Sequence, residues 1–518
     1  MVSACVSSNF LSRPIARGFI PLSFRRLLCC WQGGAVRDSA LLQIETLPTK
    51  GARTHYSWGE IYSCISIVNL LEWERFPIWT IPNTMHYPWW YVPGVTAPML
   101  IAVIAVVHVF VAHYAVGGGI LIALENQFAI KTKDKAYRDY WYKHARFFVL
   151  LTVAFGAITG VGIWWTIALA SPLATESLIR TFVFGWAIEW VFFIVEIAAA
   201  FIMYYFWTKL PERTHCVIAW IYGIAAWISL VLITGITAFM LDSRGIVANW
   251  SETGNFWLAF FNPQFLPQMI ARTGGAILLA GMYVFLHAAW VYRNDHGNPL
   301  LEKVVRRMAR PLLFGIITII IGVAWSGALL SETALITIER SVLMNVLVAL
   351  FFGIGVLVTT LIFFGPILHP KSINLGFAVS LFVLSLTALS VMEFAREAIR
   401  KPWIVDHVVL GNQIYADEVA HRQQEGFLQQ SDPALFPIPT DTVERGGMVF
   451  MYHCNNCHAI DRGMSAVGPL LYGESKERIA DKIRHLNVPT LSMPPWCGTD
   501  DELDALVEFL MTIRPEAK

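Results

Sequence analysis

The chain has 518 residues, a length that would suit three or four soluble domains of ~150 residues each. Its composition excludes such a protein. Hydrophobic residues make up 56% of the sequence and charged residues 14%. That leaves too little charge to cover a soluble surface, so most of the chain must contact lipid. The net charge of +1 excludes nucleic-acid binding through phosphate contacts, and eight cysteines in this length exclude a disulfide-built scaffold.

The first 84 residues have mixed composition and no apolar run that could cross a bilayer. A secretory signal needs a basic start followed by about 7–15 apolar residues, and here Pro21, Arg25 and Arg26 interrupt the apolar stretch. Met85 begins the segment MHYPWWYVPGVTAPM, which is typical of an aromatic anchor at a membrane interface. Two interpretations remain: residues 1–84 are a genuine N-terminal extension, or translation begins at Met85.

Residues 97–395 contain eight apolar runs, each long enough to provide the ~20 residues that a membrane-spanning helix needs. These runs are 97–127, 147–170, 181–207, 215–241, 273–292, 311–330, 341–365 and 373–395. Lipid offers a backbone amide no hydrogen-bond partner, so the spans should be helices rather than strands. The sequence therefore predicts an all-α fold, with a polytopic bundle of about eight transmembrane helices in residues 85–405.

Lysine and arginine are distributed unequally between the connections that join these runs. Connections after odd-numbered spans contain fourteen: Lys131, Lys133, Lys135, Arg138, Lys143, Arg146, Lys209, Arg213, Arg293, Lys303, Arg306, Arg307, Arg310 and Lys371. The other connections contain four: Arg180, Arg244, Arg272 and Arg340. Positive charge favours the cytoplasm. We therefore expect a multi-pass protein of a bacterial inner membrane, with both ends of the bundle on the periplasmic side.

The C-terminal part of the chain regains soluble character. Residues 406–440 contain two Gln-Gln pairs and three prolines, which predict a polar linker. Residues 441–518 form a separate small domain, and its last stretch, DDELDALVEFLMTI, repeats apolar residues at helical spacing. That repeat places Leu503, Leu506, Val507 and Leu510 on one helix face. The charge distribution places this domain in the periplasm.

The small domain contains the motif Cys454-Asn-Asn-Cys457-His458. Two thiols at this spacing can add to the vinyl groups of one haem, and the following histidine can ligate its iron. Met493 is the candidate sixth ligand. A zinc or thiol-redox motif would need a second ligand pair or a βαβ context, and neither is present. The domain resembles a short class I cytochrome c, so we expect one covalent haem c, an all-α fold and a terminal helix packed on the first. Cys497 is expected to have no role in this site.

Ionisable residues inside the apolar runs are candidates for function, because an unpaired polar side chain is costly in lipid. His108 and His113 lie in the first run, Glu189 and Glu196 two turns apart in the third, and His287 in the fifth. The end of the eighth run contains Glu393, Arg396, Glu397, Arg400, Lys401, Pro402 and Trp403. We interpret His108 as an iron ligand. A buried carboxylate at Glu189 indicates a metal, a haem or a proton path.

Structural interpretations compete with these. His144 and His215 are expected at cytoplasmic helix ends rather than on a metal. His287 could serve a haem or a hydrogen bond between helices. The carboxylates of Glu393 and Glu397 could pair with neighbouring arginines at the surface. Glu189 has no such local partner.

Helices one to four, and the segment that ends near residue 405, resemble subunit I of the cytochrome bd oxidases. VVHVFVAHYAVGGGILIALEN is similar to that family's first span, AIEWVFFIVE to its third and LPERTHCVIAW to the start of its fourth. The resemblance implies membrane haem b or haem d, with His108 and Glu397 as candidate axial ligands. It also implies that Glu189 and Glu196 serve the di-haem site. The family's short motif is matched by Arg400-Lys401-Pro402-Trp403.

The sequence departs from the family at the low-spin haem b and at the quinol site. Ala271 stands where the family has a histidine ligand, and Val342 where it has a methionine, with Met344 nearby. That haem is either absent or rebuilt with His287. The family's long quinol-oxidising connection is reduced to SETALITIER, so quinol oxidation is expected to be absent.

These features together predict a respiratory electron-transfer cytochrome in which a tethered haem c replaces quinol as the source of electrons. A flexible linker of roughly 40 residues would hold the domain at high effective concentration over the bundle. Electrons would pass from a periplasmic donor through haem c to membrane haem, where oxygen or another small oxidant is reduced. A second membrane subunit is expected from the family. The alternatives are a non-catalytic relay between a periplasmic redox enzyme and the membrane, and a bundle that only anchors the cytochrome.

Overall fold

The computed structural model describes residues 90, 92–243, 256–295, 297–430, 437–487 and 492–515. All of them belong to one compact unit that comprises residues 78–518. The two interpretations of residues 1–84, and the proposed start at Met85, lie outside the described residues. The fold is helical, with one two-stranded antiparallel sheet among the described residues.

Eight helical segments of the described chain are long and apolar enough to cross a membrane, which confirms the eight predicted spans. They are α2 (Ala97–Thr132), a second segment (Lys135–Ala170), α6 (Val183–Tyr205), α7 (Glu212–Phe239), α10 (Phe265–Val291), α11 (Pro299–Ala328), a seventh segment (Val342–Ile367) and α14 (Leu375–Ala398). The second consists of α3 (Lys135–Val149), the π-helical turn η2 (Leu150–Phe155) and α4 (Gly156–Ala170). The seventh consists of α13 (Val342–Ile362) and η3 (Phe363–Ile367).

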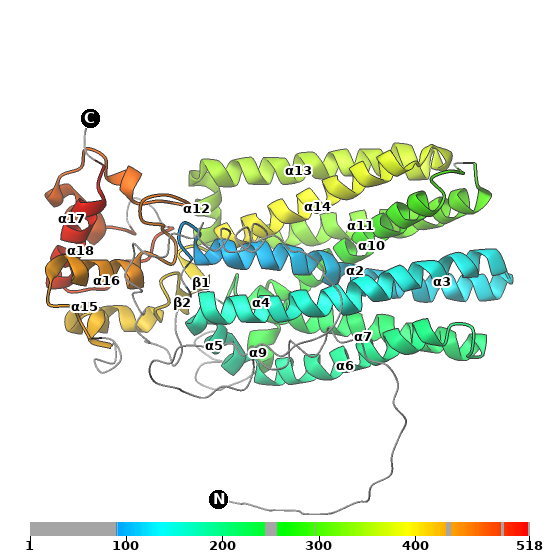
Figure 1. Ribbon diagram of the computed structural model, residues 1–518, viewed down its shortest axis with the longest axis horizontal. Coiled ribbons are helices and arrows are strands. Elements are labelled where there is room, and N and C mark those ends of the chain that lie inside the picture. The colour runs from blue at the N-terminus through cyan, green and yellow to red at the C-terminus, as the bar shows by residue number, and fades with distance from the viewer. Residues whose placement is uncertain are drawn as a thin grey trace, which may run out of the picture. The chain divides into compact units, whose positions relative to one another are not determined.

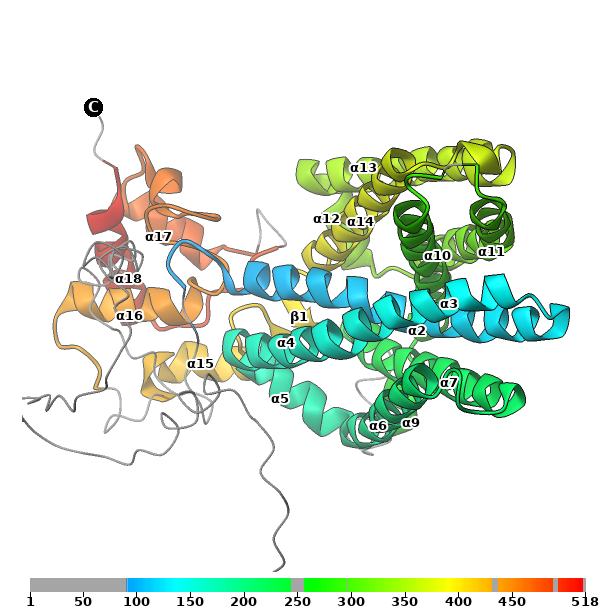
Figure 2. The same cartoon turned by 45° about the vertical axis from the view of Figure 1, so that its right-hand side comes forward.

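Four short helices join or extend these spans. They are α5 (Pro172–Thr181), α9 (Phe256–Phe260), α12 (Glu332–Arg340) and η4 (Pro370–Ser372). Figures 1 and 2 show α6 and α7 on one side of α2, and α13 and α14 on the other. The helix α10 contacts α2, α7, α11 and α14, so it is central to the bundle.

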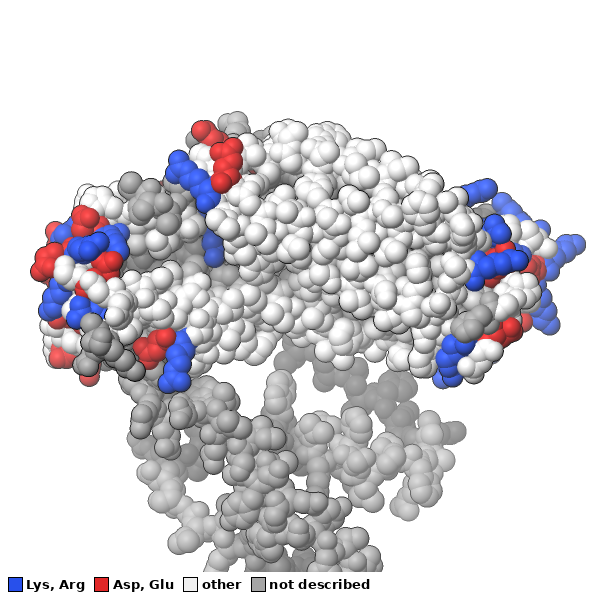
Figure 3. Space-filling view, turned by 90° about the horizontal axis from the view of Figure 1, so that it is seen from above, with Lys and Arg blue, Asp and Glu red and all other residues white. Residues whose placement is uncertain are grey.

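The surface of the bundle fits a lipid environment. Large apolar side chains point outward along its helices, among them Ile158, Val161, Trp190 and Val356, each more than half exposed. Lys, Arg, Asp and Glu gather at the two ends of the view in Figure 3 and leave an uncharged band between them. A soluble protein would not leave so wide an apolar belt in water.

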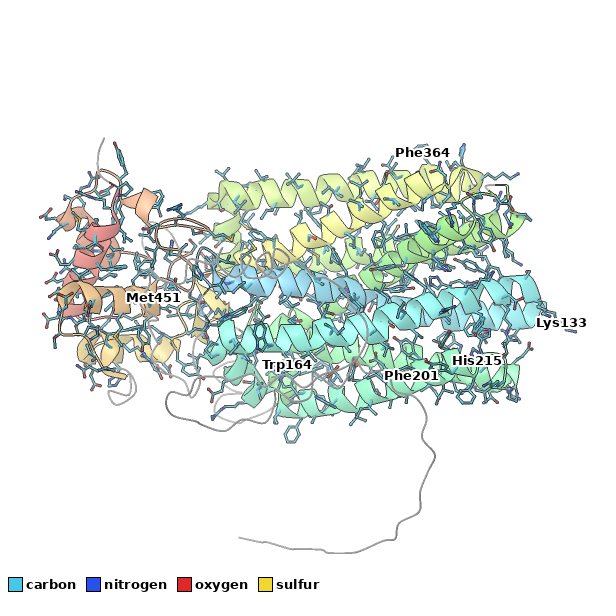
Figure 4. The ribbon with its side chains drawn as sticks, in the orientation of Figure 1. Lys133, Trp164, Phe201, His215, Phe364 and Met451 are labelled. Atoms are coloured by element: carbon cyan, nitrogen blue, oxygen red, sulfur yellow. The ribbon has the colours of Figure 1, made fainter. Side chains whose placement is uncertain are left out.

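Small residues bring the central helices close together. A Cβ on Gly117 of α2 would lie 2.0 Å from the backbone oxygen of Ala276 on α10, so no side chain fits between these helices. At the lysine-rich end, Glu125 of α2 forms an ion pair with Arg307 of α11 and accepts a 2.7 Å hydrogen bond from the Tyr137 hydroxyl. Figure 4 shows Lys133 and His215 toward this end of the bundle, far from Met451.

The C-terminal domain is built around two packed helices. The hairpin of β1 (Trp403–Val405) and β2 (Val409–Leu410) follows α14 and leads into this domain. The elements of the domain are η5 (Ala416–Glu418), α15 (Val419–Glu425), η6 (Leu428–Gln430), α16 (Thr442–His453), η7 (Gly468–Leu471), α17 (Lys476–Arg484) and α18 (Asp500–Ile513). A Cβ on Gly446 of α16 would lie 1.9 Å from the Ala505 oxygen, so α16 and α18 make direct backbone contact. The predicted terminal helix is confirmed, and its apolar face is buried.

The segment expected to be a flexible linker is folded where it is described. Leu410, Ile414, Phe427 and Leu428 are buried in the core of the C-terminal domain. The Glu502 carboxylate of α18 accepts hydrogen bonds from the Phe427 and Leu428 amides at 2.8 and 2.7 Å. The expectation of flexibility was therefore wrong, because these apolar residues are spaced too irregularly to be recognised as core positions among the glutamines and prolines.

Candidate functional site

The CxxCH motif lies in the loop that directly follows α16. Cys454 and Cys457 are free thiols and are not exposed. Burial raises the pKa of Cys454 to about 12 and also raises the pKa of Cys457, so both remain protonated at neutral pH. The His458 Nδ1 lies 2.7 Å from the Ser465 carbonyl oxygen, which requires Nδ1 to donate. The Nε2 of His458 is therefore left as the lone-pair donor for an iron.

Met493 lines a pocket of about 360 Å³. Its remaining walls are Thr333, Pro402, Trp403, His407, Leu410, Ala416, Val419, Asn487 and Pro495. These residues offer two thiols, an imidazole with one free nitrogen, and a thioether beside an apolar pocket. That set of donors fits haem c. Among the described residues, no group of three or more His, Cys, Asp or Glu could hold a metal ion.

Two neighbours of this loop are structural. The His453 ring stacks on Trp496, with ring centroids 4.9 Å apart, and its Nε2 accepts a 3.2 Å hydrogen bond from the Cys497 amide. Burial lowers the pKa of His453 to about 4, which keeps the ring neutral. Burial raises the pKa of Cys497 to about 12, so this thiol is poorly reactive and suits the expectation that it has no role.

His108 of α2 is oriented by the neighbouring span. Its Nδ1 lies 3.1 Å from the Thr159 hydroxyl oxygen of α4, and that hydroxyl donates to the Phe155 carbonyl at 2.9 Å. Because the hydroxyl proton is already used, the His108 Nδ1 must be the donor, and Nε2 is free for an iron. A Cβ on Gly160 would lie 3.3 Å from His108 Cε1, so the glycine makes room for the ring. His108 thus fits the role of a haem ligand.

The two glutamates of α6 lie close enough for their charges to interact. The Glu196 Oε1 is buried and has no hydrogen-bond partner among the described residues. Ser229 of α7 lies beside it. An unpartnered carboxylate oxygen inside an apolar helix fits a group that takes up and releases protons.

Two ion pairs follow each other at the end of α14. Glu393 pairs with Arg396 at 2.8 Å, and Glu397 pairs with Arg400. The pairs do form, as the structural interpretation expected, but they are not at the surface, because the Glu393 and Arg400 side chains are each 3% exposed. The Glu393 Oε1 and the Arg400 Nε have no partner among the described residues. Arg400 also donates to the Ile404 carbonyl at 2.7 Å.

This end of the bundle lies beside the CxxCH loop. The charges of Lys401 and Glu397 act on the Cys457 thiol, and the charge of Lys401 also acts on His458. The Ala97 amide at the start of α2 donates to the Asn456 carbonyl at 3.2 Å. The CxxCH loop therefore contacts the bundle, and an electron-transfer pair of haem c and a haem at Glu397 stays a prediction.

The structure adds two residues that sequence analysis did not assign to a site, His113 and Arg272. The His113 ring is 4% exposed, and the charges of Arg272 and Glu393 act on it. Arg272 was expected in a connection, but α10 begins at Phe265, because proline is tolerated in the first turn of a helix and Pro267 does not delay its start. The sequence did contain a signal for this pair. An arginine inside an apolar helix needs an opposite charge, and a glutamate on another span can supply it.

Two further histidines of the bundle are buried. His144 lies in α3 and His215 in the first turn of α7, and each is 0% exposed. Their assignment to the cytoplasmic membrane interface stays a prediction. Each has a buried partner: the Tyr114 hydroxyl lies 3.1 Å from the His144 Nε2, and the His215 Nε2 lies 2.8 Å from the Met203 carbonyl. The His144 Nδ1 has no partner among the described residues. A helix-end histidine can point inward, and sequence position alone does not show this.

His287 lies against His144, with ring centroids 4.9 Å apart. His287 is near the end of α10 at Val291. With a rise of 1.5 Å per residue, it lies about 24 Å along the helix from Ala271, the position of the family's histidine ligand. Its Nδ1 has no partner among the described residues. The use of His287 to rebuild the low-spin haem site stays a prediction.

Comparisons with known proteins agree with this division. Residues 97–337 match the family model of cytochrome bd terminal oxidase subunit I. Residues 441–510 match that of cytochrome c oxidase, cbb3-type, subunit III. The bd oxidase structure from Geobacillus thermodenitrificans is similar in fold, with a TM-score of 0.52 and 16% sequence identity over 60% of this chain and 89% of that one. No curated protein matches the chain.

The first family implies haem b or haem d, and the second implies haem c. The chain is therefore a membrane cytochrome of electron transfer, in which a cytochrome bd oxidase subunit I domain is joined to a cytochrome c domain.

Proposed function

We propose that this protein takes electrons from a periplasmic donor into a covalent haem c and passes them to membrane haem, where oxygen or another small oxidant is reduced. The observation that carries the proposal is the contact between the CxxCH loop and the bundle, where the Ala97 amide of α2 donates to the Asn456 carbonyl at 3.2 Å. Haem c supplies one-electron chemistry when bound.

In the C-terminal domain, the residues hold and tune that group. Cys454 and Cys457 would bind it covalently, and Ser465 fixes the His458 ring with Nε2 toward the iron. Met493 would complete the ligand set, and a thioether ligand raises the reduction potential.

In the bundle, His108 and Glu397 would hold membrane haem, with Arg400 paired to Glu397 and Trp403 in the hairpin that follows. Thr159 keeps the His108 ring in the ligating tautomer. Glu189 and Glu196 would carry protons toward the reduced oxidant, and the unpartnered oxygen of Glu196 suits that role. His287 remains a further candidate ligand.

The proposal excludes quinol as the electron source. The connection between α11 and α13 consists of residues 329–341 and contains only the short helix α12. The charge distribution of the connections favours a periplasmic C-terminal domain in a bacterial inner membrane. On that side, a soluble redox protein can reach haem c directly. A second membrane subunit is part of the proposal.

One observation favours the second candidate, a non-catalytic electron relay. The Glu397 carboxylate pairs with Arg400, which competes with its binding to iron. A relay has six-coordinate haems only and binds no small ligand, whereas a catalytic haem keeps an open position.

The test measures turnover of the purified protein with a reduced periplasmic cytochrome and with ubiquinol, together with the spectrum after addition of carbon monoxide. We expect oxygen uptake with the cytochrome only, and a carbon monoxide shift in a membrane haem band. Oxidation of ubiquinol would contradict the loss of the quinol site. Membrane haem bands without a shift would favour the relay.

A further inference from the structure

The pocket beside Met493 is shared between the C-terminal domain and the end of the bundle. Met493, Pro495 and Asn487 belong to the C-terminal domain, whereas Pro402, Trp403, His407 and Leu410 belong to the hairpin β1–β2 that follows α14. The hairpin lies outside the matched cytochrome c segment, 441–510. A domain that moved freely on a linker would not share its pocket in this way.

Two rings of the hairpin form a stack inside this pocket. Trp403 and His407 have ring centroids 5.1 Å apart and planes 12° apart. The His407 Nδ1 lies 2.9 Å from the Asp406 carboxylate, and Asp406 accepts a 3.3 Å hydrogen bond from the Ser243 amide beyond the end of α7. The stack is therefore held to the bundle by backbone and carboxylate contacts.

The same hairpin contacts both candidate haem sites. Arg400 is the ion-pair partner of Glu397. It donates a hydrogen bond to the carbonyl of Ile404, a residue that lies between Trp403 and His407 in the chain. On the other side, the Gly411 amide donates to the Pro402 carbonyl at 2.7 Å, and the position of a Cβ on Gly411 lies 3.9 Å from the Cys457 Sγ. Hydrogen bonds of the hairpin segment thus reach Arg400, the partner of Glu397, on one side and the CxxCH loop on the other.

The C-terminal domain is also fixed at the start of α2. The Met464 amide donates to the Gly94 carbonyl at 3.0 Å, in addition to the bond between Ala97 and Asn456. The Asn456 side chain donates to the Gly411 carbonyl. The CxxCH loop is therefore held from two sides, by residues 94–97 and by the hairpin.

We propose that the hairpin β1–β2 is a fixed electron bridge, with Trp403 and His407 as its conducting contact, and that the C-terminal domain works while docked. This rests on the proposed function. One electron leaves ferrous haem c, which becomes ferric, and reduces ferric membrane haem to ferrous. No bond forms or breaks and no proton moves. An external donor must then dock on a face of the domain other than the hairpin side.

The test follows the reoxidation of haem c in the full-length protein after pulsed photoreduction. It compares the wild type with Trp403→Leu and His407→Leu, and with the control Tyr472→Leu, whose ring is 59% exposed. Each protein is measured in buffer and in glycerol of rising viscosity. The haem c absorption and reduction potential are recorded for every variant, because a merely structural role would change them.

We expect a transfer rate that does not depend on viscosity, slows severalfold in both hairpin variants and is unchanged in Tyr472→Leu, with the haem c spectrum and potential retained. A rate that falls with viscosity would overturn the bridge, because it would show a domain that must move before each transfer. Hairpin variants that match the control would overturn it as well. A protein without membrane haem bands would overturn the proposed function along with the bridge, so the two failures are distinguishable.

Discussion

The His108 imidazole of α2 and the Thr159 hydroxyl of α4 meet at 3.1 Å inside the bundle. The hydroxyl proton is already donated to the helix backbone, so the contact fixes which nitrogen of His108 carries a proton. One side-chain contact between two spans therefore prepares a single nitrogen for iron.

We predict that His108→Ala removes one membrane haem signal and leaves haem c intact. Thr159→Val should retain the ligand but loosen it, with a loss of ~10–100-fold in haem affinity or activity, the usual effect of removing such a supporting contact. Optical spectra and haem retention on dilution measure both. Thr166→Val is the control, because that hydroxyl donates only to its own helix at 2.8 Å. Equal behaviour of the two threonine variants would contradict the role of Thr159.

Replacement of Met493 tests the sixth ligand of haem c. Met493→Ala should keep the covalent haem, lower its reduction potential and open the iron to carbon monoxide, because the thioether that favours ferrous iron is gone. Redox titration and a carbon monoxide difference spectrum measure these changes. Met511→Ala, in a partly buried position on α18, is the control. A haem c that keeps its potential in Met493→Ala would assign the sixth ligand to another residue.

The buried pair at the end of α14 should be costly to break. Glu393→Gln leaves the Arg396 charge without its carboxylate, and loss of one partner of a buried pair lowers the free energy of unfolding by about 3–5 kcal/mol. The exposed pair of Glu176 and Arg180 supplies the control, and Glu176→Gln should cost at most about 1 kcal/mol. Unfolding in detergent compares them. If Glu393→Gln is as stable as Glu176→Gln, the pair has no structural role.

His453 makes the C-terminal domain sensitive to acid. Its pKa is about 4 in the fold, because burial disfavours the charged ring, against about 6.5 when unfolded. The stability it contributes is therefore fully present above pH ~6.5 and is lost as the pH falls toward the folded pKa, by roughly 3 kcal/mol in total.

His453→Gln keeps an acceptor for the Cys497 amide but does not titrate. The variant should lose less stability than the wild type between pH 7 and pH 4. Unfolding of the full-length protein, followed by visible circular dichroism of haem c, measures the difference. If the wild type and His453→Gln lose the same stability between pH 7 and pH 4, the acid sensitivity does not come from His453.

Much of this structure could be predicted from the sequence, because its strongest signals are local. The eight spans follow from run length and composition, and the α18 face follows from helical spacing. The folded state of residues 406–430 could not be predicted, because its burial depends on distant partners such as Glu502. The same holds for Arg272, His144 and His215, whose surroundings are set by packing between helices rather than by position along the chain.

Haem c and membrane haem should occupy one protein and exchange electrons. A reduced-minus-oxidised spectrum of the purified full-length chain, quantified as pyridine haemochromes, tests it most directly. The account predicts one covalent c-type haem together with non-covalent haem b or haem d, all reduced by a donor that reaches haem c. A c-type signal alone would contradict it and leave the bundle as a membrane anchor for the cytochrome.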